Sequence, residues 1–309
     1  MPYNSVISRT DAASMVPEAV SSLMLNNLSE SSAALELGTR INVPRNQTRF
    51  PVLTALPTAY WVSGDTGLKQ TTEAAWDNKY LNIEEIATIV PIPEAVLDDA
   101  GFDIWGAIRP LMENAISRAF DAAVFFGTSA PASFPDDIVT SAVAADNVIA
   151  RGTNAAAAGG LHGDLSDLLA TIEADGYVPN GAVGNVTLKG RLRQVRATTG
   201  ETIMLPFDFP EPRYALPGLW PTGLSAAELI VGDFTQLVVG VRQDMTYKLI
   251  TEGVITDNTG AIIFNLPQQD MVALRLVFRA GWAVSNPINY QEDTEADRYP
   301  FGVLRSPAS

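Results

Sequence analysis

The chain has few residues of the kinds that carry out catalysis or bind metals. It contains no cysteine and a single histidine, His162. Disulfides, cysteine nucleophiles and zinc sites built from several imidazoles are therefore excluded. A serine triad would need His162, but no Gly-x-Ser-x-Gly sequence accompanies it. His162 stands just before a predicted helix at 165–174, and we expect an exposed loop position for it.

Carboxylates are plentiful, but none of them form a recognisable catalytic pair. The closest pairs, Glu84–Glu85, Asp98–Asp99 and Asp136–Asp137, are adjacent in the chain, so their side chains diverge. The sequence also lacks a phosphate-binding glycine loop and a calcium loop. We therefore expect no catalytic residue, no cofactor and no metal site, and a protein that is not an enzyme. A hydrolase with two acids from distant positions stays open as an alternative.

The basic residues are mostly arginine. Of the 20 basic residues, 16 are arginine and 4 are lysine. Arginine is enriched and lysine depleted at protein–protein interfaces, because a guanidinium is weakly hydrated and readily buried. The composition favours a chain that assembles, although a lineage preference for arginine codons would explain it equally well. A basic cluster at 189–196 is expected to be a solvated or salt-bridged face.

Charge and hydropathy exclude two classes of partner. The 309-residue chain has a formal charge of −15, which argues against a surface that binds nucleic acid by neutralising phosphates. No apolar run reaches the roughly 18 residues that span a membrane. Its first residues lack the charged and apolar regions of a signal peptide. We expect neither specific DNA binding nor membrane contact.

The longest predicted helix covers residues 104–126. Its apolar residues recur every three or four positions, which predicts one buried stripe made of Ile104, Ile108, Leu111, Ala115, Ala119, Ala122 and Phe126. At about 1.5 Å per residue this helix is a rod of roughly 35 Å. Asp98, Asp99 and Asp103 suit its beginning and Gly127 its end. Pro110 predicts a kink or a later start.

A long strand is predicted at 272–284. Its even-numbered residues are large and apolar, which is the period of two expected of a strand with one buried face. Arg275 and Arg279 share the opposite face, about 13 Å apart. We expect them to pair with carboxylates, within the domain or across an interface; binding of an anionic substrate is the alternative.

Residues 51–90 predict a long two-stranded excursion. The apolar stretches 59–62 and 81–83 flank a polar middle that contains Trp61 at its edge and Trp76 within it. Two tryptophans in a polar hairpin are unusual for a monomer. They either pack on their own domain or dock on a neighbouring subunit.

Several short motifs follow one another in order between about residues 50 and 290. Phe50-Pro51-Val52-Leu53, Ala59-Tyr60-Trp61-Val62 and Leu81 to Pro93 lead through Leu97-Asp98-Asp99 to the long helix. Later come Val231-Gly232-Asp233-Phe234-Thr235-Gln236, then Gly240-Val241-Arg242-Gln243-Asp244, and finally Gln269 to Arg275 with Arg279-Ala280-Gly281. The ordered set resembles the major capsid proteins of tailed bacteriophages, which share the Hong Kong 97-like fold.

The resemblance implies an α+β fold with distinct parts. Residues 1–50 would be an N-terminal arm, 51–90 an extended β-hairpin loop with its flanking strands, and 91–165 the first part of a peripheral domain with a spine helix at 104–126. An axial domain would follow at 166–247, a return to the peripheral domain at 248–290, and a C-terminal interaction tail at 291–309.

The resemblance also implies a function. Copies of the chain would assemble as pentamers and hexamers into the icosahedral head of a tailed phage, formed in the host cytoplasm, and enclose double-stranded DNA without binding it specifically. Its partners would be a portal, possible decoration proteins and a separate scaffolding protein, because only about 50 residues precede the matching order. An encapsulin-like nanocompartment shell shares the fold and is the main alternative.

Inter-subunit contacts are expected at six residues: Trp61, Lys69, Trp76, Lys79, Arg275 and Arg279. Some members of the family join their subunits by a lysine–asparagine isopeptide bond. Lys69 is the best-placed lysine for one, with Asn286 or Asn289 as its partner, although neither asparagine matches the family pattern. We expect instead that tryptophan and arginine contacts lock the subunits without a covalent bond.

Overall fold

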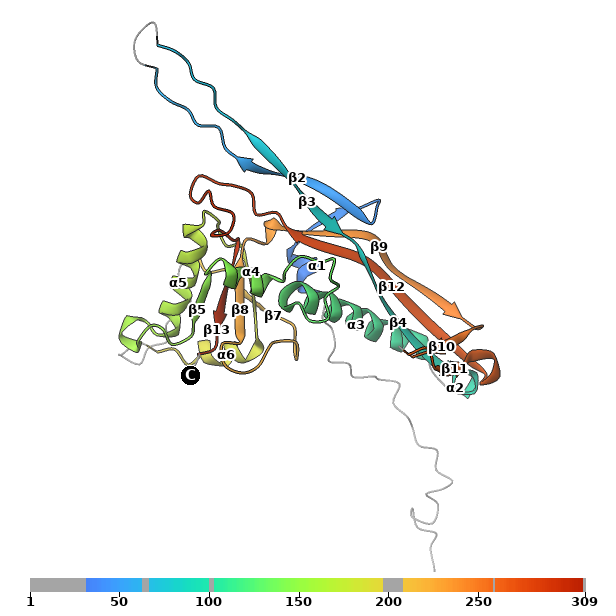
Figure 1. The fold of residues 1–309 in the computed structure, drawn as a ribbon. Helices are drawn as coiled ribbons and strands as arrows, with labels where there is room; N and C mark the ends of the chain where they lie inside the picture. Colours follow the sequence, from blue (N-terminus) through green and yellow to red (C-terminus); the bar gives the residue numbers. More distant parts are fainter. Residues whose placement is uncertain (1–31, 63–66, 100–102, 197–207, 258, 308–309) are drawn as a thin grey trace, which may run out of the picture.

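The computed structural model describes residues 32–62, 67–99, 103–196, 208–257 and 259–307. Figure 1 shows a sheet with one long helix along its face, a second sheet flanked by shorter helices, and a two-stranded hairpin that projects away from both. The architecture is α+β, as predicted.

The strand predicted at 272–284 lies in the middle of the first sheet, which we call the peripheral sheet. Here β12 (Met271–Val284) lies between β9 (Leu237–Ile250) and β4 (Glu84–Pro93) and is antiparallel to both. The edge strand β1 (Thr39–Asn42) pairs in parallel with β9. The strand is confirmed and every even-numbered position of β12 is buried, but Ala273, Val277, Gly281 and Ala283 on the other face are buried as well.

The helix α3 (Ile104–Phe126) covers the even-numbered face of this sheet. Its Phe120 meets Phe278 of β12 edge to face, with ring centroids 6.1 Å apart. The helix begins at Ile104 and contains Pro110, so a later start is wrong, and it ends at Gly127 as expected. Asp98 and Asp99 do not open it, because they end a separate helix, α2 (Glu94–Asp99).

The buried stripe of α3 matches the predicted one only in part, because Ala122 is buried as predicted and other members are not. Met112, Ile116 and Phe120 face the sheet, whereas Leu111 and Ala119 of the predicted stripe are exposed. Both sets have helical spacing, so periodicity alone does not choose between them. The buried set carries larger side chains and removes more apolar surface from water than the alanine-rich set.

The second sheet, which we call the axial sheet, has five strands. Their order is β5 (Val148–Ala150), β13 (Phe301–Arg305), β8 (Ala227–Gly232), β6 (Gly181–Gly184) and β7 (Pro212–Tyr214). The helix α5 (Leu161–Ala174) packs on one face and α4 (Ile138–Ala144) on the other, while α6 (Val186–Leu192) follows β6. His162 lies in the first turn of α5 rather than in a loop.

Residues 291–309 were expected to form an interaction tail, and this is wrong for residues 301–305. These residues are β13, which pairs with β5 on one side and β8 on the other. Phe301, Val303 and Leu304 are fully buried. A five-residue run is too short for periodicity to identify, so its partners in the sheet decide its structure.

The N-terminal part also differs from the prediction. Residues 1–31 lie outside the described residues. Residues 33–42 of the predicted arm are part of the packed core, because Ala33 and Ala34 of α1 (Ala33–Leu37) are fully buried and β1 joins the peripheral sheet.

The hairpin ladder lies closer to the body than predicted. It is formed by β2 (Gln47–Ala55) and β3 (Ala75–Asn82), whereas residues 59–62 are not in a strand. A smaller hairpin of β10 (Val254–Thr256) and β11 (Ile262–Asn265) lies at the opposite end of the peripheral sheet. Three short 3-10 turns complete the assignment: Ala156–Ala158, Phe234–Gln236 and Leu266–Gln268.

The hairpin is attached where the chain passes from β3 to β4 across the peripheral sheet. Leu81 and Ile83 at this junction lie over Gly240 of β9 and Gly281 of β12, which face each other in register. A β-carbon on Gly281 would overlap the Asn82 carbonyl oxygen, and one on Gly240 would overlap the Leu81 side chain. Only glycine lets the backbone approach the sheet this closely.

Replacing Gly281 by alanine should therefore destabilise the fold. Because the obstacle is backbone, we expect Gly281→Ala to lower the free energy of unfolding by about 1–3 kcal/mol or more. In α6, a β-carbon on Gly190 meets no atom within 4 Å, so Gly190→Ala should raise stability by about 1 kcal/mol through helix propensity. Chemical denaturation of the unassembled chain measures both; a Gly281→Ala chain as stable as the parent would contradict this account.

A buried carboxylate joins α1 to α3. Asp121, which is 2% exposed, accepts hydrogen bonds from the Ser32 hydroxyl (2.5 Å) and the Ala33 and Ala34 amides (2.8 and 3.2 Å). Burial raises the pKa of Asp121 from 3.8 to about 6, although these hydrogen bonds and Arg213 oppose the rise. The carboxyl group is thus protonated more readily in the folded protein than in the unfolded chain.

This difference predicts a pH dependence of stability. A raised pKa favours folding fully below about pH 4, and this contribution is lost as the pH rises through about 6. A difference of this size corresponds to roughly 3 kcal/mol. In Asp121→Asn, which cannot titrate, the fall in unfolding free energy between about pH 4 and 7 should be smaller by up to that amount. Identical pH profiles of the variant and the parent would contradict the assignment.

Candidate subunit interface

The outer part of the extended hairpin presents apolar residues to water. Beyond the ladder, the two sides of the hairpin are joined by the Tyr60 hydroxyl, which donates to the Gln70 carbonyl at 2.5 Å. Trp61, next to this contact, is 100% exposed, Leu68 is 90% exposed and Trp76 is 65% exposed. The alternative that the tryptophans pack on their own domain is therefore wrong. Side chains of this size are normally buried.

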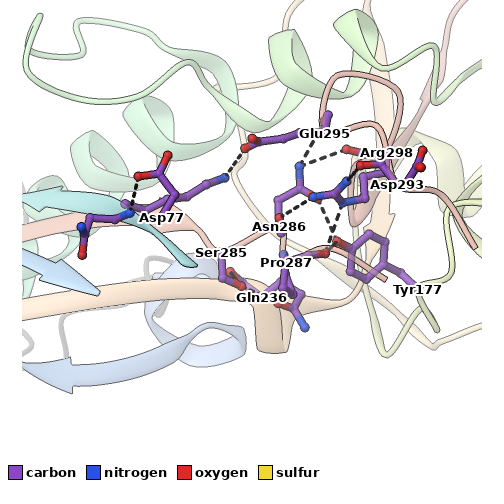
Figure 2. A network of polar contacts seen from close by, with 11 residues as sticks. Asp77, Tyr177, Gln236, Ser285, Asn286, Pro287, Asp293, Glu295 and Arg298 are labelled. Carbon is purple, nitrogen blue, oxygen red and sulfur yellow. Dashed lines mark hydrogen bonds and ion pairs between the residues drawn. The ribbon is translucent and has the colours of Figure 1, made fainter. Parts of the chain in front are cut away.

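The base of the hairpin is tied to the segment 285–300, which we call the connecting segment because it joins β12 to β13. The Ile288 amide donates to the Leu53 carbonyl of β2 at 3.1 Å. Lys79 of β3 pairs with Glu295 at 2.9 Å, as Figure 2 shows. Since exposed ion pairs contribute only about 0–1 kcal/mol, Lys79 orients the hairpin more than it stabilises the fold.

The connecting segment is held in turn by the axial part of the molecule. The Tyr177 hydroxyl donates to the side-chain oxygen of Asn286 at 2.8 Å and to the Pro287 carbonyl at 3.1 Å. Arg298, which is 2% exposed, donates to the carbonyls of Pro287 and Asp293 (Figure 2). Burial raises the pKa of Tyr177 to about 12, which keeps its hydroxyl protonated as a donor.

Both candidate asparagines have structural roles within the chain. Asn286 is 5% exposed, accepts from Tyr177 and donates to the Arg298 carbonyl at 3.1 Å. Asn289 donates to the Asp175 carbonyl at 2.6 Å and accepts two backbone amides. Lys79 meets Glu295 rather than an asparagine amide, and Lys69 makes no hydrogen bond or ion pair with the residues that the structure describes.

The two arginines of β12 differ in their surroundings. Arg279 donates from Nε and Nη2 to one carboxylate oxygen of Glu85, at 2.7 and 2.5 Å, so the predicted carboxylate pairing within the domain is confirmed for Arg279. The Nε of Arg275 is buried and has no hydrogen-bond partner among the described residues. Sequence patterns did not distinguish the two.

The basic cluster at 189–196 is partly salt-bridged. Arg191 pairs with Glu228 at 2.5 Å, and Arg151 reaches the same carboxylate at 2.9 Å. Lys189 lies over the ring of Tyr214, 5.1 Å from its centre. Across the described ranges, no group of three or more histidine, cysteine, aspartate or glutamate residues is placed to hold a metal ion. No helix in those ranges is both long and apolar enough to cross a membrane.

The order of elements along this chain is that of a known family. The phage capsid family model matches residues 12–289, which is most of the chain. The chain belongs to the phage capsid family. This capsid protein is 24% identical to the major capsid protein of Staphylococcus phage 80alpha over 287 residues, which cover 89% of this chain and 83% of that protein.

Solved structures agree with this assignment. The capsid protein is 33% identical to a chain from Microbacterium phage Oxtober96, with a TM-score of 0.84 over 98% of this chain and 100% of that chain. A chain from Mycobacterium phage Cain is 29% identical, with a TM-score of 0.85 over 99% and 100%. The predicted Hong Kong 97-like α+β fold is confirmed, and the protein is a component of the virion capsid.

The connecting segment was not recognised from the sequence, and its role can be tested at Asn286. Asn286→Ala removes an acceptor from Tyr177 and a donor from the Arg298 carbonyl, and places alanine at a φ of 38°. We expect a loss of about 1–3 kcal/mol from the hydrogen bonds alone. Asn286→Gly, which tolerates the positive φ, should lose less by roughly 1 kcal/mol. Equal stability of all three chains in chemical denaturation would show that the network is unimportant.

Proposed function

We propose that copies of this capsid protein assemble, through their extended hairpins, into pentamers and hexamers that close an icosahedral shell around double-stranded DNA. Membership of the phage capsid family supports shell formation. One observation carries the role of the hairpin: Trp61 is fully exposed at a point where the hairpin is closed by the Tyr60–Gln70 hydrogen bond. Docking on a neighbouring copy would remove this apolar surface from water and so lower the free energy of the assembled state.

The free energy released by this docking would be a substantial part of what association costs. A tryptophan buries about 150–250 Å², which at about 25 cal/mol per Å² corresponds to roughly 4–6 kcal/mol before the loss of side-chain entropy. Every copy in a shell both donates and receives such a contact. Contacts that are weak individually therefore give a stable closed particle when they are repeated.

The base network supports this function by holding the hairpin in a defined direction. Lys79–Glu295 and the Ile288–Leu53 hydrogen bond join it to the connecting segment. Because the hairpin is already held in one direction, it loses less conformational entropy when it docks. With both asparagines engaged in their own chain, non-covalent contacts of Trp61 and Trp76 are the preferred lock between subunits.

The proposal extends to the arrangement of the shell and to its partners. The peripheral sheet with α3 would form the wall between capsomer centres, and the axial sheet would surround the fivefold and sixfold axes. A separate scaffolding protein, a portal and decoration proteins would act with the shell. The charge of −15 supports confinement of DNA by the wall rather than specific binding. The family match favours a phage head over a nanocompartment, and no observation favours a carboxylate hydrolase.

Electron microscopy of the full chain, expressed with and without its scaffolding partner, tests the proposal. We expect capsomer rings or uniform closed particles. Trp61→Ala should leave thermal unfolding of the unassembled chain unchanged but lower the particle yield at least tenfold, while Trp61→Phe should keep an intermediate yield. A chain that stays a 33.1 kDa monomer with scaffolding protein present would overturn shell formation. Normal yield from Trp61→Ala would overturn the role of the hairpin.

A further inference from the structure

We call the face of the peripheral sheet turned away from α3 the outer face; it is exposed to solvent along β4, at Glu85, Ala87 and Ile89. It carries the odd-numbered residues of β4 and β12 and the residue of β9 in register with Arg275: Glu85, Ala87, Ile89, Arg275, Val277, Arg279 and Lys248. Ile89 is 43% exposed. In Figure 1 α3 runs along the opposite face, and the chain crosses the outer face at Gly240 and Gly281, at the end near the hairpin.

Two cations on this face, Arg275 and Lys248, have no carboxylate partner among the described residues. Arg275 stands in register with Lys248 on β9 and with Ile89 on β4. Like charges directly opposite each other on neighbouring strands repel. Neither cation makes an ion pair with a described residue, and the Arg275 Nε is buried without an acceptor. Four residues along the same strand, Arg279 is neutralised by Glu85.

A carboxylate from another chain would stabilise Arg275 and Lys248. A buried donor left without an acceptor costs about 1–3 kcal/mol, whereas a carboxylate placed between an arginine and a lysine would satisfy the donor and remove the repulsion. The chain has 35 acidic residues against 20 basic ones, so a second copy is a ready source.

Building on the proposed assembly, we propose that Arg275 and Lys248 of one copy bind the carboxylate of Glu73 in the extended hairpin of a neighbouring copy. Glu73 is exposed, lies beyond the ladder between Lys69 and Trp76, and makes no hydrogen bond or ion pair with a described residue. It is therefore available to a partner.

Asp77, the next acidic residue along the hairpin, and Glu73 of the same chain are less suited. Asp77 lies within the β2–β3 ladder and already accepts a hydrogen bond from the Asn78 amide. Within one chain, Arg275 lies six residues from Gly281, about 20 Å along β12. The hairpin leaves that crossing in the opposite direction (Figure 1). Glu73 therefore reaches the outer face of a neighbour and not its own.

Two apolar residues beside the cations give the rest of the hairpin a surface on which to pack. Ala87 and Ile89 are exposed next to Arg275, and Trp76 is exposed three residues from Glu73. A docked hairpin would place apolar surface on these two residues while its carboxylate meets the guanidinium. Desolvation of the pair by the indole would strengthen it relative to an exposed ion pair.

A charge exchange tests the proposal. Arg275→Glu should lower the yield of closed particles at least tenfold, and adding Glu73→Arg in the same chain should restore most of it. Asp77→Arg is the matched control and should not restore assembly. Normal assembly of Arg275→Glu, or failure of Glu73→Arg to restore it, would overturn the pairing.

A neutral variant provides a second readout that reverses no charge. Glu73→Gln keeps the size of the side chain but removes the carboxylate that Arg275 would bind, and should lower the yield of closed particles at least fivefold. Asp77→Asn is its matched control and should leave the yield unchanged. Should charge reversal prevent folding, Glu73→Gln decides, and a normal yield from it overturns the pairing.

The two proposals fail in different ways. If the parent chain and Glu73→Gln close particles equally well, the pairing is overturned and the shell function stays intact. A parent chain that never closes particles with its scaffolding protein would overturn the shell function itself.

Discussion

The close passage of the chain across Gly240 and Gly281 is the contact on which the rest of the architecture depends. It lets Leu81 and Ile83 settle directly onto the peripheral sheet, where they form a small buried cluster with Val43. β3 thereby continues into β4 on the far side of the sheet without an intervening loop. One continuous segment of the chain thus forms both a strand of the projecting hairpin and a strand of the peripheral sheet, so a force on the hairpin acts directly on the sheet.

From this crossing the molecule divides into a well-packed body and a projecting part that is not packed. The body buries its large side chains, with Phe120 against Phe278 on one sheet and Phe234 against Phe301 on the other. The hairpin leaves Trp61 in water. The connecting segment spans the two, because Tyr177 and the Asp175 carbonyl bind its asparagines while its Glu295 pairs with Lys79. An assembling chain needs both properties: a body stable enough to fold alone and a surface that is satisfied only in the assembly.

Much of the fold followed from patterns in the sequence. The helix at 104–126 and the strand at 272–284 were located correctly because each element is long and its sequence is strongly periodic. Short elements were less predictable. Residues 301–305 carry a run that reads equally well as tail or strand, and partners distant in sequence, β5 and β8, decide between them. Residues 59–62 have strand-like composition but lie beyond the point where the hairpin ladder ends.

The sequence by itself determined the family, the class of protein and the absence of cysteine and imidazole chemistry, because these depend on composition and on the order of motifs. Tertiary structure alone decided which side chains have partners. Arg275 and Arg279 are the same residue type on the same strand face, yet one stands opposite a lysine and the other opposite a glutamate. Strand register sets these neighbours, and register follows from the glycine crossing and the packing of the whole sheet. A charge that one chain leaves unpaired is therefore visible only after folding.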